Sequence, residues 1–220
     1  MRKLTGSVFL SLDGVMQAPG GPDEDPTSDF KFGGWVQPYW TEAMGPFEDV
    51  IMGEYDLLLG KRTYDIFAAY WPYNQDNPIG EKFNRINKYV ATHSDEPLEW
   101  ENSQKLSDGL AEAVAELKQG DGRDLLIQGS STLYVPLLAA GLIDRLVLLT
   151  FPVLLGQGKR IFDGKEAPGA LKMVDHFVTE KGVVIASYEP DGEVPTGTFE
   201  TKAPSEAELE RREQWANEGA

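Results

Sequence analysis

Two glycine-containing segments of this chain could bind a phosphate group. They are Leu59-Gly60-Lys61-Arg62-Thr63 and Gln128-Gly129-Ser130-Ser131-Thr132. Each follows a predicted strand and opens a predicted helix, whose N-terminus offers unpaired N–H groups and a positive potential to an anion. Glycine lets the anion approach the backbone, and the cationic and hydroxyl side chains add donors. If the two strands are neighbours, the segments could hold a pyrophosphate between them; the alternative is two ordinary turns with helix caps.

Asp13 is a further candidate for a functional side chain. It closes the first predicted strand and precedes Gly14, at the end of the strand where α/β sheets gather ligands. A carboxylate at that place could bind a ring N–H group of a substrate or supply a proton. The alternative is a structural role, in which Asp13 forms an Asx turn with Gly14.

Metal, thiol and P-loop chemistry are not predicted. The chain has no cysteine, and its two histidines, His93 and His176, lie outside any metal-binding spacing. The segment Gly156-Gln157-Gly158-Lys159 lacks the glycine at 153 and the hydroxyl at 160 that a P-loop requires. We therefore expect no bound metal.

Alternating strands and helices are predicted to position these segments. Strands are expected over 4–12, 56–59, 88–92, 125–127 and 145–153. Helices are expected to begin near Thr63, at Ser107 and at Ser130 or Ser131, and the first of them should bury Ile66, Phe67, Tyr70 and Trp71. Residues 171–178 and 183–189 form a predicted hairpin. This order is typical of an α/β fold with a largely parallel sheet, to which the hairpin adds antiparallel strands.

Two segments lie outside this alternation. Residues 14–34 form a long loop rich in proline, glycine and aspartate, which is either a binding loop or a mobile surface insertion. Residues 191–220 hold eight acidic and three basic residues, and Ser205 begins a stretch that could form a short polar helix. We therefore divide the chain into a domain over 1–190 and an acidic tail over 191–220. The tail is either solvated or docks on a partner subunit.

The composition argues against polyanionic partners. The 220 residues carry a net charge of −16, so the chain repels nucleic-acid backbones and anionic lipids. Hydrophobic residues make up 41% of the chain, which is enough for a buried core and excludes a wholly disordered protein. The longest apolar stretch, 146–155, falls short of the roughly 18 residues that span a membrane. We expect a soluble cytoplasmic protein that binds neither nucleic acid nor membrane.

Four motifs occur in the order that is typical of a known superfamily. They lie at 11–14, 59–64, 129–133 and 151–162. Together they resemble the dihydrofolate reductase-like superfamily, and most closely the branch of the riboflavin-biosynthesis reductase domain. The resemblance covers about residues 1–190. It implies a three-layer α/β fold with a central, mainly parallel sheet, NADPH as cofactor, and usually a homodimer.

The resemblance assigns cofactor-binding roles to the two glycine segments. It implies that the nucleotide phosphates meet Gly60, Lys61, Arg62 and Thr63. It implies that the pyrophosphate is held by Gly129, Ser130, Ser131 and Thr132. Asp13 matches a strand-end aspartate that lies near the substrate in this branch.

The resemblance leaves the choice of cofactor open. Thr92, His93 and Ser94 follow the strand that reaches the adenosine 2′-phosphate in relatives, which often place arginine there. This chain has no arginine at these positions, so NADH is not excluded unless Arg62 compensates.

We interpret the chain as an NADPH-dependent reductase that transfers a hydride directly to a small, flat, heterocyclic substrate. Such a transfer needs little from the protein beyond positioning, because the cofactor carries the chemistry. The aromatic residues Trp35, Tyr39, Trp40, Tyr70 and Trp71 could wall the pocket, or they could pack in the core. No acid is identifiable at the place where folate-specific enzymes use one, so folate is not the expected substrate. The alternative is a non-catalytic nucleotide-binding or regulatory protein on the same fold.

Overall fold

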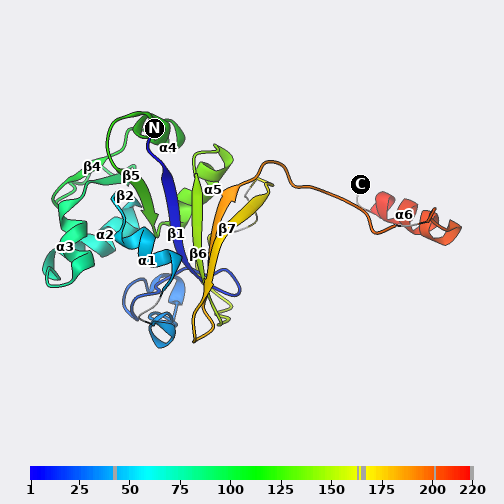
Figure 1. Ribbon diagram of the computed structural model, residues 1–220, viewed down its shortest axis with the longest axis horizontal. Helices are drawn as coiled ribbons and strands as arrows, with labels where there is room; N and C mark the ends of the chain where they lie inside the picture. The colour runs from blue at the N-terminus through cyan, green and yellow to red at the C-terminus, as the bar shows by residue number, and fades with distance from the viewer. Residues whose placement is uncertain (42–43, 163, 165–166, 201, 219–220) are drawn as a thin grey trace.

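The computed structural model describes residues 1–41, 44–162, 164, 167–200 and 202–218, and it folds them around one sheet (Figure 1). The order of the strands across the sheet is β4-β3-β2-β5-β1-β6-β8-β7. The strands are β1 Leu4–Ser11, β2 Tyr55–Gly60, β3 Lys88–Ala91, β4 Ser103–Lys105, β5 Asp124–Gln128, β6 Arg145–Phe151, β7 Leu171–Val178 and β8 Val184–Pro190.

The helices alternate with the strands, as the sequence predicts. They are α1 Pro46–Met52, α2 Lys61–Tyr70, α3 Pro78–Arg85, α4 Leu110–Gln119, α5 Ser131–Ala139 and α6 Glu206–Glu218, together with the short 3-10 helices η1 Thr27–Asp29, η2 Gln37–Tyr39 and η3 Trp71–Tyr73. Strands β4, β3, β2, β5, β1 and β6 run parallel, whereas β8 and β7 are antiparallel to their neighbours. The predicted α/β architecture with a final hairpin is therefore confirmed.

The sheet separates two hydrophobic cores, which makes the fold a three-layer one. On one face, Phe47 of α1, Tyr64 of α2 and Phe83 of α3 pack on the sheet. On the other face, Val114 of α4 and Tyr134 of α5 do so. The central strands are apolar on both sides because helices cover both of their faces, which explains why β2 is buried along its whole length.

Some local predictions were wrong. Neither α3 nor β4 was expected, because α3 is short and begins at an Asn77 cap, and β4 is a three-residue polar edge strand. Helix α4 begins after Gly109 rather than at Ser107. The face that α2 buries contains Tyr64, whereas Tyr70 is 54% exposed. A tertiary contact decides which face of α2 is buried, and not the i, i+3/i+4 spacing of its apolar residues. Tyr64 accepts a hydrogen bond from the backbone N–H of Trp100.

The loop over residues 14–34 packs against the domain rather than forming a free insertion. Val15, Ala18 and Phe30 are buried in the same core as α1 and α2. Gln17 is 3% exposed and donates hydrogen bonds to the carbonyls of Asp25 and Thr27, so it closes the loop on itself. The loop therefore presents fixed side chains at one edge of the sheet.

The tail extends away from the sheet, as Figure 1 shows for α6. Helix α6 lies where the sequence suggests a short polar helix, and none of its residues is buried. In the part of the chain that the structure describes, no helix has the length and apolar character needed to cross a bilayer.

Candidate functional site

The two glycine segments lie side by side at one edge of the sheet. Strands β2 and β5 are parallel neighbours, so the junctions that follow them, β2–α2 and β5–α5, meet. The backbone N–H of Gly60 donates a hydrogen bond of 2.7 Å to Ser130 Oγ, and that hydroxyl donates one of 2.8 Å to Thr63 Oγ1. The hydroxyl of Ser130 therefore joins the two junctions.

Both helices that start at these junctions keep open N-termini. Among the described residues, no side chain caps α2 at Gly60 or α5 at Ser130. Ser130 lies in the left-handed region with φ 62°, and its hydroxyl is directed to the other junction instead of to its own helix. Unpaired N–H groups and two helix dipoles therefore point to the same space, which suits an anion with two linked phosphates.

Gly129 is required by both the backbone and the neighbouring junction. Its φ is +81°, which side chains other than glycine rarely adopt. A Cβ atom at this position would lie 3.0 Å from Thr63 Cγ2 and 3.2 Å from Thr63 Oγ1. The close contact between the two junctions therefore depends on the absence of a side chain at 129.

The two cations of the first junction point in different directions. Lys61 Nζ forms ion pairs with Asp65 at 2.7 Å and with Glu96 at 3.3 Å, and the hydrogen bond to Asp65 raises the pKa of Lys61. Arg62 is turned to the 14–34 loop, where it donates to Thr27 Oγ1 at 3.2 Å. In the free protein Arg62 therefore points away from Glu96, and Lys61 is the cation of this junction that pairs with it.

Residues 92–94 follow β3, the next strand of the sheet, and lie beyond the first junction. The backbone N–H of Ser94 donates to Thr92 Oγ1 at 3.0 Å, which forms a turn around His93. From β4, Lys105 Nζ donates to the Ser94 carbonyl at 2.9 Å and to Asp95 Oδ1 at 3.0 Å. Sequence reasoning missed Lys105, because β4 has no apolar pattern that would have placed it next to β3.

Asp13 is held by several donors from its own chain. Its carboxylate accepts hydrogen bonds from Ser11 Oγ at 2.6 Å, from the backbone N–H of Leu155 at 3.1 Å and of Gly156 at 2.8 Å, and from Arg160 Nη2 at 3.1 Å. Burial raises the pKa of Asp13, but the hydrogen bonds outweigh burial and lower it from 3.8 to about 2. The carboxylate is therefore ionised at neutral pH and does not fit the role of a proton donor. Its role in orienting a substrate stays a prediction.

The segment after β6 is bound to the start and the middle of the 14–34 loop. Asp13 binds residues 155 and 156, and Gln17 Oε1 accepts from the Lys159 backbone at 3.0 Å. Asp25 forms an ion pair with Lys159. Burial raises the pKa of Asp25, but the hydrogen bonds from Lys159 and Thr27 outweigh burial, so the pKa is lowered. Sequence reasoning missed Gln17 and Asp25; the only signal was the resemblance of the motif at 151–162.

The aromatic residues proposed for a pocket wall fall into two groups. Trp35 and Tyr39 pack edge-on against Phe151, and Trp40 packs against Phe9 and Phe47. Tyr70 and Trp71 lie at the far end of α2 instead, where Trp71 packs against Phe67 and Phe83. The ring contacts of Tyr70 and Trp71 are with α2 and α3, whereas those of Trp35, Tyr39 and Trp40 are with strands β1 and β6 and with α1. Trp35 itself is 7% exposed and belongs to the core.

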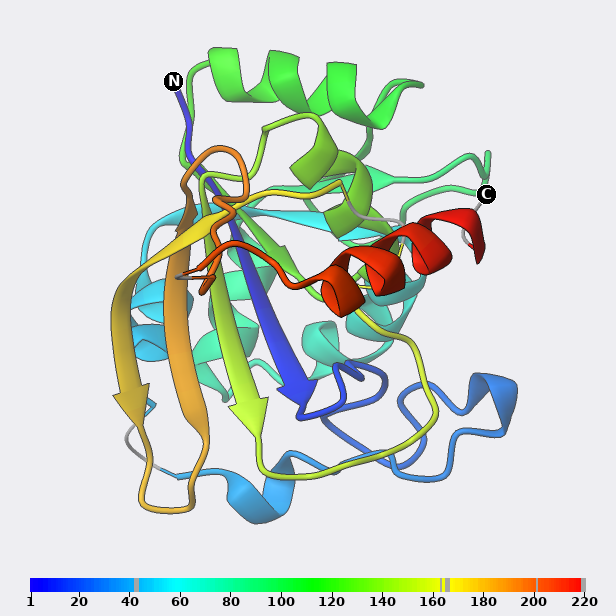
Figure 2. The same ribbon diagram turned by 90° about the vertical axis from the view of Figure 1, so that its right-hand side faces the viewer.

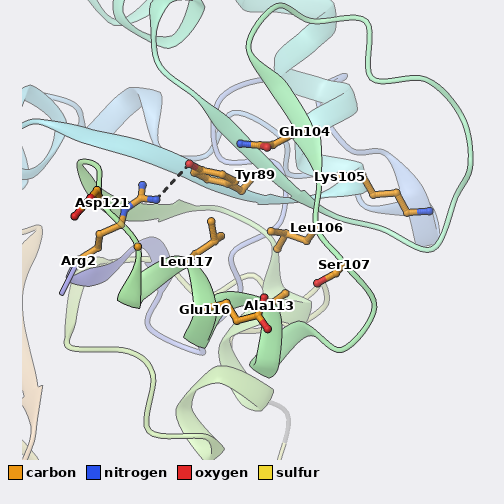
Figure 3. Close-up of a pocket in the computed structure, with 11 residues that line it drawn as sticks. Arg2, Tyr89, Gln104, Lys105, Leu106, Ser107, Ala113, Glu116, Leu117 and Asp121 are labelled. Atoms are coloured by element: carbon orange, nitrogen blue, oxygen red, sulfur yellow. Dashed lines mark hydrogen bonds between the residues drawn. The ribbon is translucent and has the colours of Figure 1, made fainter.

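Two hollows of the surface lie away from the glycine junctions. One, of about 320 Å³, lies between α4 and strands β3 and β4 (Figure 3). Its walls include Arg2, which donates to Tyr89 Oη at 3.3 Å and pairs with the buried Asp56 at 2.7 Å. The other, of about 520 Å³, lies between α2 and residues 97–101. Neither is lined by a residue of the two junctions.

The fold and this edge of the sheet define the class of the protein. Its three layers, its mainly parallel sheet and its final hairpin are the dihydrofolate reductase-like fold. The sequence profile of the RibD C-terminal domain matches residues 2–185, so the chain belongs to that family. This membership supports a nicotinamide-dependent reductase in general, and it agrees with the resemblance carried by the four motifs.

Individual relatives show how far the similarity extends. The uncharacterized protein YyaP of Bacillus subtilis (strain 168) is 28% identical over 140 residues, which are 62% of this chain and 74% of YyaP. A diaminohydroxyphosphoribosylaminopyrimidine deaminase/5-amino-6-(5-phosphoribosylamino)uracil reductase from Thermotoga maritima matches with a TM-score of 0.57 at 14% identity, over 86% of this chain and 57% of that one. Dihydrofolate reductase from Enterococcus faecalis, solved with NADP(H), matches with a TM-score of 0.54 at 16% identity, over 86% and 96%. These structural matches show a shared fold.

Proposed function

We propose that the protein is an NADPH-dependent reductase that transfers a hydride to a small, flat heterocycle. The observation that carries this proposal is the joined pair of glycine junctions, whose uncapped helix N-termini converge on one space. A dinucleotide has two linked phosphates, and this arrangement offers each of them a helix N-terminus and a close approach at Gly129.

The residues of this chain position the cofactor and the substrate and do not themselves react. A bound nicotinamide supplies the hydride. Ser130 and Thr63 hold the two junctions together, and Gly129 permits their close contact because a side chain there would meet Thr63. Asp13 holds the segment at 155–160 next to the end of β1 and keeps a negative charge there, which suits a ligand N–H group.

We infer that the chain prefers NADPH to NADH through Lys61 and Lys105. Both side chains flank the turn at 92–94, and both pair with carboxylates in the free protein, namely Glu96 and Asp95. The 2′-phosphate of NADPH can take the place of these exposed acids, because such surface ion pairs are weak.

Equilibrium titration of the purified protein tests this proposal. We expect saturable binding of NADPH and weaker binding of NADH by about tenfold or more, which corresponds to about 1.4 kcal/mol. Fluorescence of the reduced nicotinamide and calorimetry both report this binding. The proposal fails if neither dinucleotide binds.

A non-catalytic nucleotide-binding protein is the second candidate. The joined junctions are compatible with it as well, since they would hold a nucleotide without taking part in a reaction. This alternative predicts cofactor binding without turnover on a panel of pterins, flavin precursors and quinones. Oxidation of NADPH by any of them would favour the reductase.

We also propose that the protein is a homodimer that uses one face of β8 and β7. Met173 is 51% exposed, Val178 56% and Val184 43%, and the strand register places them on the face that holds Leu146. Figure 2 looks onto these strands, and no described helix packs over them. An apolar patch of this kind is typical of an interface, and a second copy related by a twofold axis offers the same patch in return.

Light scattering coupled to size exclusion measures this assembly. We expect a dimer for the native chain and a monomer for Met173→Glu, because a buried unpaired charge opposes the interface. Val194→Glu is the control, since Val194 is 50% exposed in the tail and outside the patch. A native chain that is monomeric at all concentrations would contradict the proposal.

A further inference from the structure

Two buried polar side chains on neighbouring strands have hydrogen-bonding atoms without a partner. Ser7 of β1 is 0% exposed and Gln128 of β5 is 9% exposed, and the two residues face each other in the strand register. Among the described residues, neither Ser7 Oγ nor Gln128 Oε1 has a hydrogen-bond partner. Buried polar atoms are almost always paired in folded proteins, so this pair requires an explanation.

The pair lies beneath the candidate site. Side chains alternate along a strand, so Ser7 shares its face of the sheet with Phe9, and Gln128 shares it with Leu126. Phe9 and Leu126 belong to the core that α1 and α2 cover, so the pair faces those helices. Gln128 is the last residue of β5 and directly precedes Gly129, so the pair lies next to the β5–α5 junction.

Packing alone does not account for these two residues. Phe9, Leu126 and Val147 lie next to them on the same face and are apolar, and Val147 pairs with Ser7 from β6. An alanine and a methionine would fill the same space without leaving polar atoms unpaired. A serine hydroxyl and a side-chain amide at adjacent positions instead offer an acceptor for an N–H group and a donor for a carbonyl.

We propose that Ser7 and Gln128 bind the amide edge of a ligand in the reductase site. The shared chemistry is an N–H group beside a carbonyl, which occurs in the carboxamide of nicotinamide and in the lactam of a flat heterocyclic substrate. Gln128 Oε1 accepts from the ligand N–H, and Ser7 Oγ donates to the ligand carbonyl. This inference rests on the proposed function, because it places the ligand in the site that the two glycine junctions form.

Three variants test the pair. Ser7→Ala and Gln128→Met remove the polar atoms and keep the volume similar. Ser103→Ala is the matched control, because Ser103 Oγ is also buried without a partner but lies on β4, four strands from β1. None of the three loses a hydrogen bond within the free protein, so we expect all of them to fold and to keep or raise their melting temperature.

Three probes distinguish the source of the amide. They are NADPH, adenosine 2′,5′-bisphosphate, which lacks nicotinamide, and uracil added to the complex with NADP⁺. If the carboxamide is bound, Ser7→Ala and Gln128→Met each lower the affinity for NADPH at least tenfold. Their affinity for the bisphosphate stays that of the native chain. If a lactam is bound, the affinity for NADPH is unchanged and the affinity for uracil falls at least tenfold. In both cases Ser103→Ala binds every probe as the native chain does.

Other results overturn the inference. If the native chain binds NADPH and both variants bind all three probes as it does, Ser7 and Gln128 have no role in recognition. The inference then fails while the proposed function stands. The same holds if Ser103→Ala weakens a probe as much as they do. If the native chain binds neither NADPH nor the bisphosphate, the proposed function fails and the inference fails with it.

Discussion

Replacing Gly129 by aspartate is expected to weaken NADPH binding by at least 100-fold. The new carboxylate would lie beside Thr63, in the space where the two helix N-termini converge. A unit charge about 5 Å from a phosphate in a site of effective dielectric constant near 20 costs about 3 kcal/mol, which is more than 100-fold in affinity. The φ of +81° adds strain, so we also expect a loss of stability of about 1–2 kcal/mol.

Gly129→Asn is the matched control for this prediction. Asparagine has the shape of aspartate and the same backbone strain, but it carries no charge. We expect it to lose the same stability and to retain much more affinity than the aspartate variant. Titration by calorimetry and unfolding in urea measure the two quantities separately. Equal affinity of Gly129→Asp and the native chain would show that the phosphates bind elsewhere.

Asp13→Asn is expected to destabilise the domain in a pH-dependent way. The folded-state pKa of Asp13 is lowered from 3.8 to about 2, so the ionised carboxylate stabilises the fold at every pH above about 4. This contribution is lost as the pH falls from about 4 towards about 2. Solvent weakens the effect because 22% of the side chain is exposed, so we expect a loss of about 1 kcal/mol at pH 7.

Urea unfolding between pH 7 and pH 3 measures this difference. The gap in unfolding free energy between the native chain and Asp13→Asn should be constant down to about pH 4.5 and shrink below it. Asp23→Asn serves as the control, because Asp23 is an exposed aspartate in the 14–34 loop that follows Asp13. A gap that widens as the pH falls would contradict the assignment, since it would mean that the protonated carboxyl is the stabilising form.

Sequence patterns were sufficient for the features that depend on a few neighbouring residues. Apolar runs closed by glycine predicted β2 and β5, and the residues after them correctly predicted two strand-to-helix junctions. The hairpin of β7 and β8 followed from two strand patterns around Gly182, whose φ is +80°. The polar edge strand β4 carries no such pattern, and so it was missed together with Lys105.

The residue types along the chain are enough to predict the alternation of strands and helices and the glycines between them. Three features follow from the folded arrangement instead: Ser130 joins the two junctions, Arg62 turns to the 14–34 loop, and hydrogen bonds hold Asp13 in its ionised form. Their partners are far apart along the chain. Asp13 and Leu155 are 142 residues apart, and Ser130 and Gly60 are 70 apart, so no local spacing encodes these contacts. The order of strands in the sheet brings them together.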